Sequence, residues 1–231
     1  MGKVAAHAHA IAVDLPGIGA SVGCTPSHDK RTLARYIRSL LDALNMRATT
    51  LVGHDIGGQI VYVYLREYPD EFARAVLMNI VIPGIDPWPG VIRNPHIWHF
   101  AFHSIPNLSE KLVAARQDAY FKYFYDVLAT TPETVSEETQ RLYVSAYSRP
   151  EALRTGFDGY RAFPQDEKDN GTTYGQPVRT LLLDIRGAKE QGEIGQYTAG
   201  LRAAGLQNVR DKTVPGSGRF APDEQPPRSQ K

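Results

Sequence analysis

One octet constrains the fold of this sequence more than any other feature: Leu51-Val52-Gly53-His54-Asp55-Ile56-Gly57-Gly58. A short apolar run enters it, and a segment with helical spacing of apolar residues leaves it. A strand, a tight glycine-flanked turn and a helix form the context of a nucleophile elbow. The central residue of such a turn has a strained backbone, so its neighbours must be small. The octet therefore predicts a sharp turn with Asp55 at its centre.

Asp55 has two interpretations at this position. The N-terminal end of a helix favours an anion, and a carboxylate there can attack carbon to form an ester that water must hydrolyse. Alternatively, Asp55 only caps the helix, since Asp is a favoured N-cap residue. The octet alone leaves both open.

Composition limits the class of protein. The 231 residues suffice for one domain, or for a core with an inserted subdomain. The chain has 26 basic and 25 acidic residues without a basic block, so we expect no nucleic-acid partner. The single Cys24 excludes an internal disulfide and fits a reducing compartment. No apolar run reaches the roughly 20 residues of a membrane span, and no signal peptide is evident. We expect a cytoplasmic protein without a membrane partner.

The pattern along the first part of the chain alternates between strands and helices. Strands are expected at 9–14, 49–52 and 72–80, and helices at 29–44 and from the octet to about residue 68. This order predicts parallel βαβ units. The pattern changes after Pro83: residues 84–165 are helix-like and rich in aromatic residues, most of them core rings and one or two facing a cavity. Residues 166–175 are expected to be a linker, followed by a strand at 179–185, a helix at 194–204 and a strand at 209–214.

These motifs together resemble the α/β-hydrolases that carry an Asp nucleophile: the epoxide hydrolases and the haloalkane and haloacetate dehalogenases. The matching segments are Asp14–Ser21, Gly53–Gly58, Trp98-His99-Phe100, Ala146-Tyr147-Ser148, Tyr160-Arg161 and Pro215–Pro226. The resemblance implies an α/β fold: a parallel sheet with helices on both faces and an inserted helical cap. It divides the chain into a first core part, 1–83, a cap, 84–165, and a second core part, 166–231.

The resemblance also implies a chemistry. In such enzymes the Asp attacks the carbon that bears the epoxide oxygen or the halogen, and a His oriented by an acid then activates water against the ester. Asp55 matches the nucleophile. Tyr160 and Trp98 match cap residues that hold the leaving group, although Tyr160 could instead be a core tyrosine. An indole N–H donates to a halide or an oxygen but does not readily supply a proton, so Trp98 shifts the expectation slightly toward halide substrates.

Three departures from the pattern affect catalysis. Arg219 stands where the family has its base His, and an arginine cannot act as a base. Asn79 stands at the first position expected for the acid, and Glu190 is the candidate at the second. Rescue by His96, His99 or His103 is the alternative. The family also has several strands and an oxyanion loop before the segment at Asp14, and this chain shows no counterpart. We interpret it as a shortened gene model or a fragment in preference to a smaller fold.

We therefore expect a hydrolase of the epoxide hydrolase and dehalogenase group whose ester hydrolysis is impaired. A catalytically inactive descendant that binds a small ligand in the capped pocket is the alternative, and non-hydrolytic chemistry in the same pocket is a third. The expected partner is a small organic molecule, and a homodimer is left open. No cofactor and no metal are expected, because His7 and His9 lack further ligands nearby and Gly17 and Gly19 complete no nucleotide-binding motif.

Overall fold

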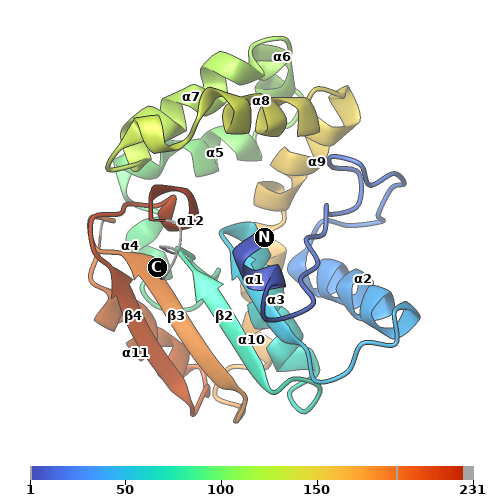
Figure 1. Cartoon of the computed structure of the whole chain (residues 1–231), viewed down its shortest axis with the longest axis vertical. Helices are drawn as coiled ribbons and strands as arrows, with labels where there is room; N and C mark the ends of the chain where they lie inside the picture. The colour runs from blue at the N-terminus through green and yellow to red at the C-terminus, as the bar shows by residue number, and fades with distance from the viewer. Residues whose placement is uncertain (1, 191, 226–231) are drawn as a thin grey trace.

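The computed structural model describes residues 2–190 and 192–225 (Figure 1). Its centre is a parallel sheet in the order β1-β2-β3-β4, made of β1 Thr50–His54, β2 Arg74–Met78, β3 Leu181–Gly187 and β4 Val209–Val214. Val76 pairs with Val52 on one side and with Leu183 on the other. The carboxyl ends of all four strands therefore meet at one edge of the sheet, where α/β folds place their sites.

The strands predicted near the octet and in the last third of the chain are confirmed, within a few residues at their ends. The strand predicted at 9–14 is wrong: these residues form no ladder, and the side chains of Ile11 and Val13 are 43% and 45% exposed. An apolar run becomes a strand only when a neighbouring strand pairs with its backbone groups. Among the described residues, β1 pairs with β2 alone.

The main core lies between the sheet and the helices that pack on one of its faces. Helices α3 Ile56–Glu67 and α11 Ile194–Ala203 contact the strands directly, and α2 Lys30–Ala43 packs against α3. The side chains of Ala75, Leu77 and Leu182 point into this core and are buried. The intervening residues Val76 and Leu183 are only half-buried, as the alternation along a strand requires. Helix α2 begins where predicted, and the Asp29 carboxylate caps it by accepting from the backbone N–H of Thr32.

A layer of helices follows β2, and most of it lies beyond the strand ends, at the top of Figure 1. We call Trp88–Arg161 the helical layer. It consists of α4 Trp88–Val91, η1 Pro95–Ile97, α5 Trp98–Ser104, α6 Leu108–Val113, α7 Gln117–Leu128, η2 Pro132–Thr134, α8 Glu137–Ala146 and α9 Pro150–Arg161. The short α1 Gly2–Ala5 and α12 Ala221–Glu224 lie near the two ends of the described chain. No helix among the described residues is long and apolar enough to cross a membrane.

The linker predicted at 166–175 is wrong, because α10 occupies Phe163–Thr172 and spans the boundary expected between 165 and 166. Two of its polar residues, Asp166 and Asn170, are buried and have partners distant in sequence. The Asp166 carboxylate accepts from the backbone N–H and from the Nζ of Lys30, both at 2.8 Å, and the Asn170 amide donates to the Pro83 carbonyl. Both side chains of the Lys30–Asp166 pair are fully buried. This ion pair therefore joins α10 to the start of α2.

Candidate functional site

The turn between β1 and α3 has the strained geometry of a nucleophile elbow. Asp55 has φ 51° and ψ −126°, a conformation that non-glycine residues rarely adopt. Two glycines make room for it. A Cβ atom on Gly53 would collide with the backbone of Gly57 and Gly58, and a Cβ atom on Gly58 would collide with the side chain of Ile80. Strained residues that close packing holds in place are found preferentially at functional sites, which makes Asp55 a candidate functional residue.

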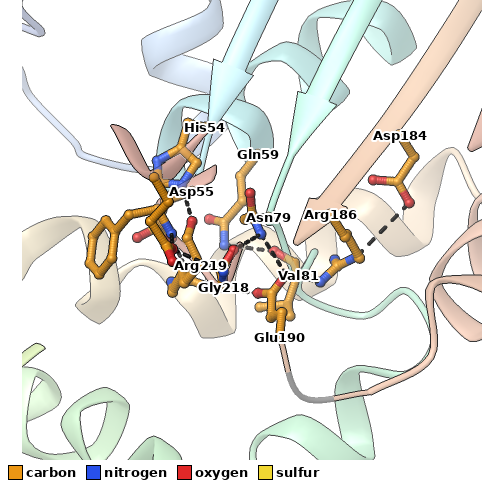
Figure 2. A network of polar contacts seen from close by, with 12 residues as sticks. His54, Asp55, Gln59, Asn79, Val81, Asp184, Arg186, Glu190, Gly218 and Arg219 are labelled. Carbon is orange, nitrogen blue, oxygen red and sulfur yellow. Dashed lines mark hydrogen bonds and ion pairs between the residues drawn. The ribbon is translucent and has the colours of Figure 1, made fainter. Parts of the chain in front are cut away.

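The side chain of Asp55 does not cap α3, although the residue occupies the N-cap position. Its Oδ1 instead lies 2.9 Å from Nη2 of Arg219 (Figure 2). Burial alone would raise the pKa of Asp55, but the charge of Arg219, with a smaller contribution from His54, holds this pKa below its usual value. Asp55 is therefore an ionised carboxylate that faces away from its own helix.

Three contacts besides the ion pair with Asp55 fix Arg219. Its Nη1 donates to Oε1 of Glu190 at 3.1 Å, its backbone N–H donates to the Leu128 carbonyl, and its carbonyl accepts from Nε2 of His54 at 3.0 Å. The carboxylate of Glu224 also accepts from the backbone N–H groups of Gly218 and Phe220, which closes the loop around Arg219. Burial would lower the pKa of Arg219, but the carboxylates of Asp55 and Glu190 outweigh it and raise this pKa further. The guanidinium remains charged.

Asn79 lies just beyond β2 and touches the same cluster. It has φ 50°, and its side chain is fully buried. Its Nδ2 donates to Oε2 of Glu190 at 2.6 Å and to the Gly218 carbonyl at 3.3 Å. Asn79 therefore positions Glu190, and its neutral amide adds no charge at this point.

Glu190 belongs to a row of side chains with alternating charge that runs from Asp184 to Arg219 (Figure 2). Asp184 lies 4.0 Å from Arg186, Arg186 lies 3.3 Å from Glu190, and Glu190 in turn contacts Arg219. Neither carboxylate oxygen of Asp184 has a hydrogen-bond partner among the described residues. Burial raises the pKa of Asp184 to about 6, against the opposing charge of Arg186. Each charge in the row is thus partly compensated by its neighbours.

A cavity of about 570 Å³ opens above Asp55. Its walls are mostly apolar and aromatic, and its volume suits a small organic ligand. The polar side chains that line it include Asp55, Arg219 and His54 from below, and His99, His103, Tyr120, Tyr147 and Tyr160 from the helical layer. Among the described residues, no group of three or more His, Cys, Asp or Glu is placed to hold a metal ion.

The two residues predicted to hold the leaving group lie in different surroundings. Tyr160 lines the cavity, and burial together with the nearby Asp55 charge raises its pKa well above the usual value, so it remains a protonated phenol. Trp98 is not among the described residues that line the cavity. Its indole N–H donates to the Tyr123 hydroxyl at 3.2 Å, and its side chain is 39% exposed. The structure therefore brings Tyr160, and not Trp98, to Asp55.

The comparisons with known proteins agree with the observed fold. The sequence profile of the alpha/beta hydrolase fold matches residues 3–224. The chain belongs to this family. The soluble epoxide hydrolase of Corynebacterium sp. (strain C12) is 27% identical over 225 residues, which are 94% of this chain and 76% of that protein. Among solved structures, Cfl2 from Burkholderia cenocepacia has a TM-score of 0.82 at 28% identity, covering 92% of this chain and 73% of Cfl2. The ligand-free epoxide hydrolase CorEH has a TM-score of 0.80 at 25% identity, covering 92% of this chain and 76% of that structure.

Within this hydrolase fold, the histidines considered as replacement bases separate into two groups. His99 and His103 line the cavity, whereas His96 lies in η1 and is not among the described lining residues. Burial lowers the pKa of His99 to about 4, and the Arg219 charge contributes. Burial lowers the pKa of His103 to about 3. Both imidazoles are neutral near pH 7 and are weak bases.

Sequence reasoning missed several residues of the site. Tyr147 lines the cavity and has its pKa raised to about 12, first by burial and then by the Asp55 charge. Tyr120 reaches the cavity from α7, and Glu224 holds the Arg219 loop. The available signals were the position of Tyr147 in the matching segment Ala146-Tyr147-Ser148 and that of Glu224 within the closing motif Pro215–Pro226.

Proposed function

We propose that this chain acts through Asp55 as a nucleophile on a small epoxide, and that the resulting ester persists because Arg219 replaces the hydrolytic base. The observation that carries the proposal is the Asp55 carboxylate: it is held in a strained turn, does not cap its helix, is ionised, and lines an apolar cavity. The relative described as a soluble epoxide hydrolase supports the substrate class.

The first step needs only groups that line the cavity. Because Arg219 holds Oδ1 of Asp55, Oδ2 attacks an epoxide carbon and forms the ester bond. The ring C–O bond breaks with its electron pair on oxygen, and Tyr160 supplies the proton that converts this oxygen to a hydroxyl. Solvent then returns a proton to Tyr160. On a carbon–halogen bond the same attack would release a halide ion.

The second step lacks a base. Hydrolysis of the ester requires a group that takes a proton from water, and a guanidinium whose pKa is raised further cannot do so. His99 has a pKa of about 4, far from the value near neutrality at which a general base is effective. His103 is already hydrogen-bonded to Tyr120. The alkyl ester on Asp55 would therefore accumulate.

One observation favours a second function, the reversible binding of a small ligand. In the ion pair, the positive charge of Arg219 compensates the negative charge of the Asp55 carboxylate and lowers its reactivity as a nucleophile. In this case the helical layer acts as a cap over a binding cavity, and no covalent bond forms.

The indole of Trp98 is engaged with Tyr123, so the argument that favoured halides over epoxides loses its support. Action on carbon–halogen bonds, the role of the helical layer as a cap domain and a cytoplasmic location remain proposals.

Intact-mass measurement after incubation with styrene oxide, and separately with fluoroacetate, tests the proposal. We expect a stable mass increase from one styrene oxide, mapped to the peptide that contains Asp55 and absent in Asp55→Asn. Release of the diol with repeated turnover would contradict the stalled ester. Saturable binding without adduct or product would support the second function instead.

A further inference from the structure

Two polar side chains, His103 and Tyr120, line the part of the cavity that the helical layer forms, where the surrounding side chains are aromatic. Nε2 of His103 on α5 lies 2.6 Å from the hydroxyl oxygen of Tyr120 on α7. Both residues line the cavity. The His103 ring packs at 4.7 Å from the ring of Phe157 and at 4.3 Å from that of Tyr160, and its side chain is buried. Placing polar groups among aromatic rings costs free energy unless each finds a partner.

The protons on this pair can be counted. Burial lowers the pKa of His103, although the Asp55 charge opposes this shift, so the imidazole is neutral and carries one ring proton. Burial raises the pKa of Tyr120, so the phenol keeps its proton. If His103 donates from Nε2, the Tyr120 O–H remains free to donate. If Tyr120 donates to Nε2, its oxygen keeps its capacity to accept. Nδ1 of His103 has no partner among the described residues in either case.

The Tyr120 hydroxyl can therefore donate or accept, according to which tautomer His103 adopts. A hydroxyl group on a ligand needs such an adaptable partner, and a carbonyl needs a donor. A carboxylate would need a cation, but Arg219 is already paired with Asp55 and Glu190. The His103–Tyr120 pair therefore suits a neutral oxygen group on a ligand.

We propose that Tyr120 and His103 form a second polar subsite, which binds a neutral hydroxyl or carbonyl oxygen on the ligand away from its reacting carbon. The assignment of a reacting end rests on the proposed function of Asp55, whereas the binding of the neutral oxygen does not. The preferred ligands are small molecules with a second polar group, and simple haloacids are disfavoured.

The test compares probes that differ in one remote hydroxyl: styrene oxide against 4-(hydroxymethyl)styrene oxide, and their unreactive diols. Rates of Asp55 labelling are measured for the epoxides, and dissociation constants by NMR titration for the diols. One neutral hydrogen bond predicts that the wild-type chain favours the hydroxymethyl probes by about twofold to twelvefold. Tyr120→Phe removes the hydroxyl and should abolish this preference, whereas His103→Phe removes only the group that orients it and should reduce the preference. Tyr123→Phe is the control, because Tyr123 contacts Trp98 and is not among the described lining residues.

The outcomes separate the two proposals. Diol preference without Asp55 labelling would contradict the proposed function and support the subsite. Labelling without a preference, or a preference that survives Tyr120→Phe, would overturn the subsite alone. Unchanged thermal midpoints will show that the conservative Tyr120→Phe variant is folded.

Discussion

Nη2 of Arg219 lies 2.9 Å from Oδ1 of Asp55, while Nη1 of the same guanidinium lies 3.1 Å from Oε1 of Glu190. One cation thus spans two carboxylates beside the cavity. It lowers the pKa of Asp55 and cannot accept a proton itself. Under the proposed function, this arrangement keeps Asp55 ionised for attack and opposes the hydrolysis of the resulting ester.

Removing this cation should change how labelling depends on pH. Because Arg219 lowers the pKa of Asp55 against the effect of burial, Arg219→Met should raise this pKa and move the loss of labelling to a higher pH. Arg219→Lys retains a positive charge and should keep most of the wild-type profile. The rate of styrene oxide adduct formation between pH 4 and pH 8 measures the shift. Superimposable profiles for the wild type and Arg219→Met would contradict the role of the ion pair.

Tyr160 and Trp98, the two residues that the sequence predicted to hold the leaving group, should respond differently to substitution. Tyr160→Phe removes the cavity-lining phenol that we propose as the proton donor and should slow labelling by about a hundredfold, within the usual range for general acid catalysis. Trp98→Phe should leave the rate within about twofold, because the indole contacts Tyr123 and not Asp55. A larger effect at Trp98 would contradict its placement away from the reacting groups.

Asp184 should make the folded state less stable as the pH rises. Its pKa is raised from 3.8 to about 6, so the folded state binds this proton more tightly than the unfolded state does. Burial of the charged form therefore costs about 3 kcal/mol above pH 6, and the cost disappears as the pH falls toward 4. Asp184→Asn should be more stable than the wild type at pH 8 and equal to it near pH 4, as measured by urea unfolding. Asp211→Asn on the neighbouring strand, 41% exposed, is the control and should show no such crossing.

The Lys30–Asp166 pair should behave as a buried ion pair that is costly to break and replaceable as a unit. Both side chains are buried, and Lys30 also donates to the Gly159 carbonyl. Asp166→Leu leaves a buried ammonium and should lower the free energy of unfolding by about 3–5 kcal/mol. The double variant Lys30→Met, Asp166→Leu should recover most of this loss. Additive losses in the double variant would show that the two residues act independently.

The sequence was most informative where local patterns carry the signal. Glycines around Asp55 and alternating strands and helices predict the elbow and the sheet, because steric limits and hydrophobic periodicity are properties of short segments. The strand at 9–14 could not be excluded in this way, since Ile11 and Val13 look apolar whether or not a partner strand is present. The linker at 166–175 failed for a related reason: Asp166 is polar, and its buried cation is Lys30, distant in the chain.

The site was only partly predictable for the same physical reason. Arg219, Asn79 and Glu190 were each identified from motif positions, but their contacts depend on three loops meeting at the strand ends. Trp98 and His99 are adjacent in the sequence, and only the rotation of α5 decides that His99 lines the cavity. That rotation is set by packing among aromatic rings, which no local pattern encodes.

The lifetime of the ester on Asp55 tests the central claim most directly. The styrene oxide adducts of the wild type and of Arg219→His would be freed of excess reagent and followed by intact mass at pH 7.5. The account predicts that the wild-type adduct persists for hours, while the Arg219→His adduct decays at least about tenfold faster because a base is restored. Equally rapid decay of the wild-type adduct would contradict it.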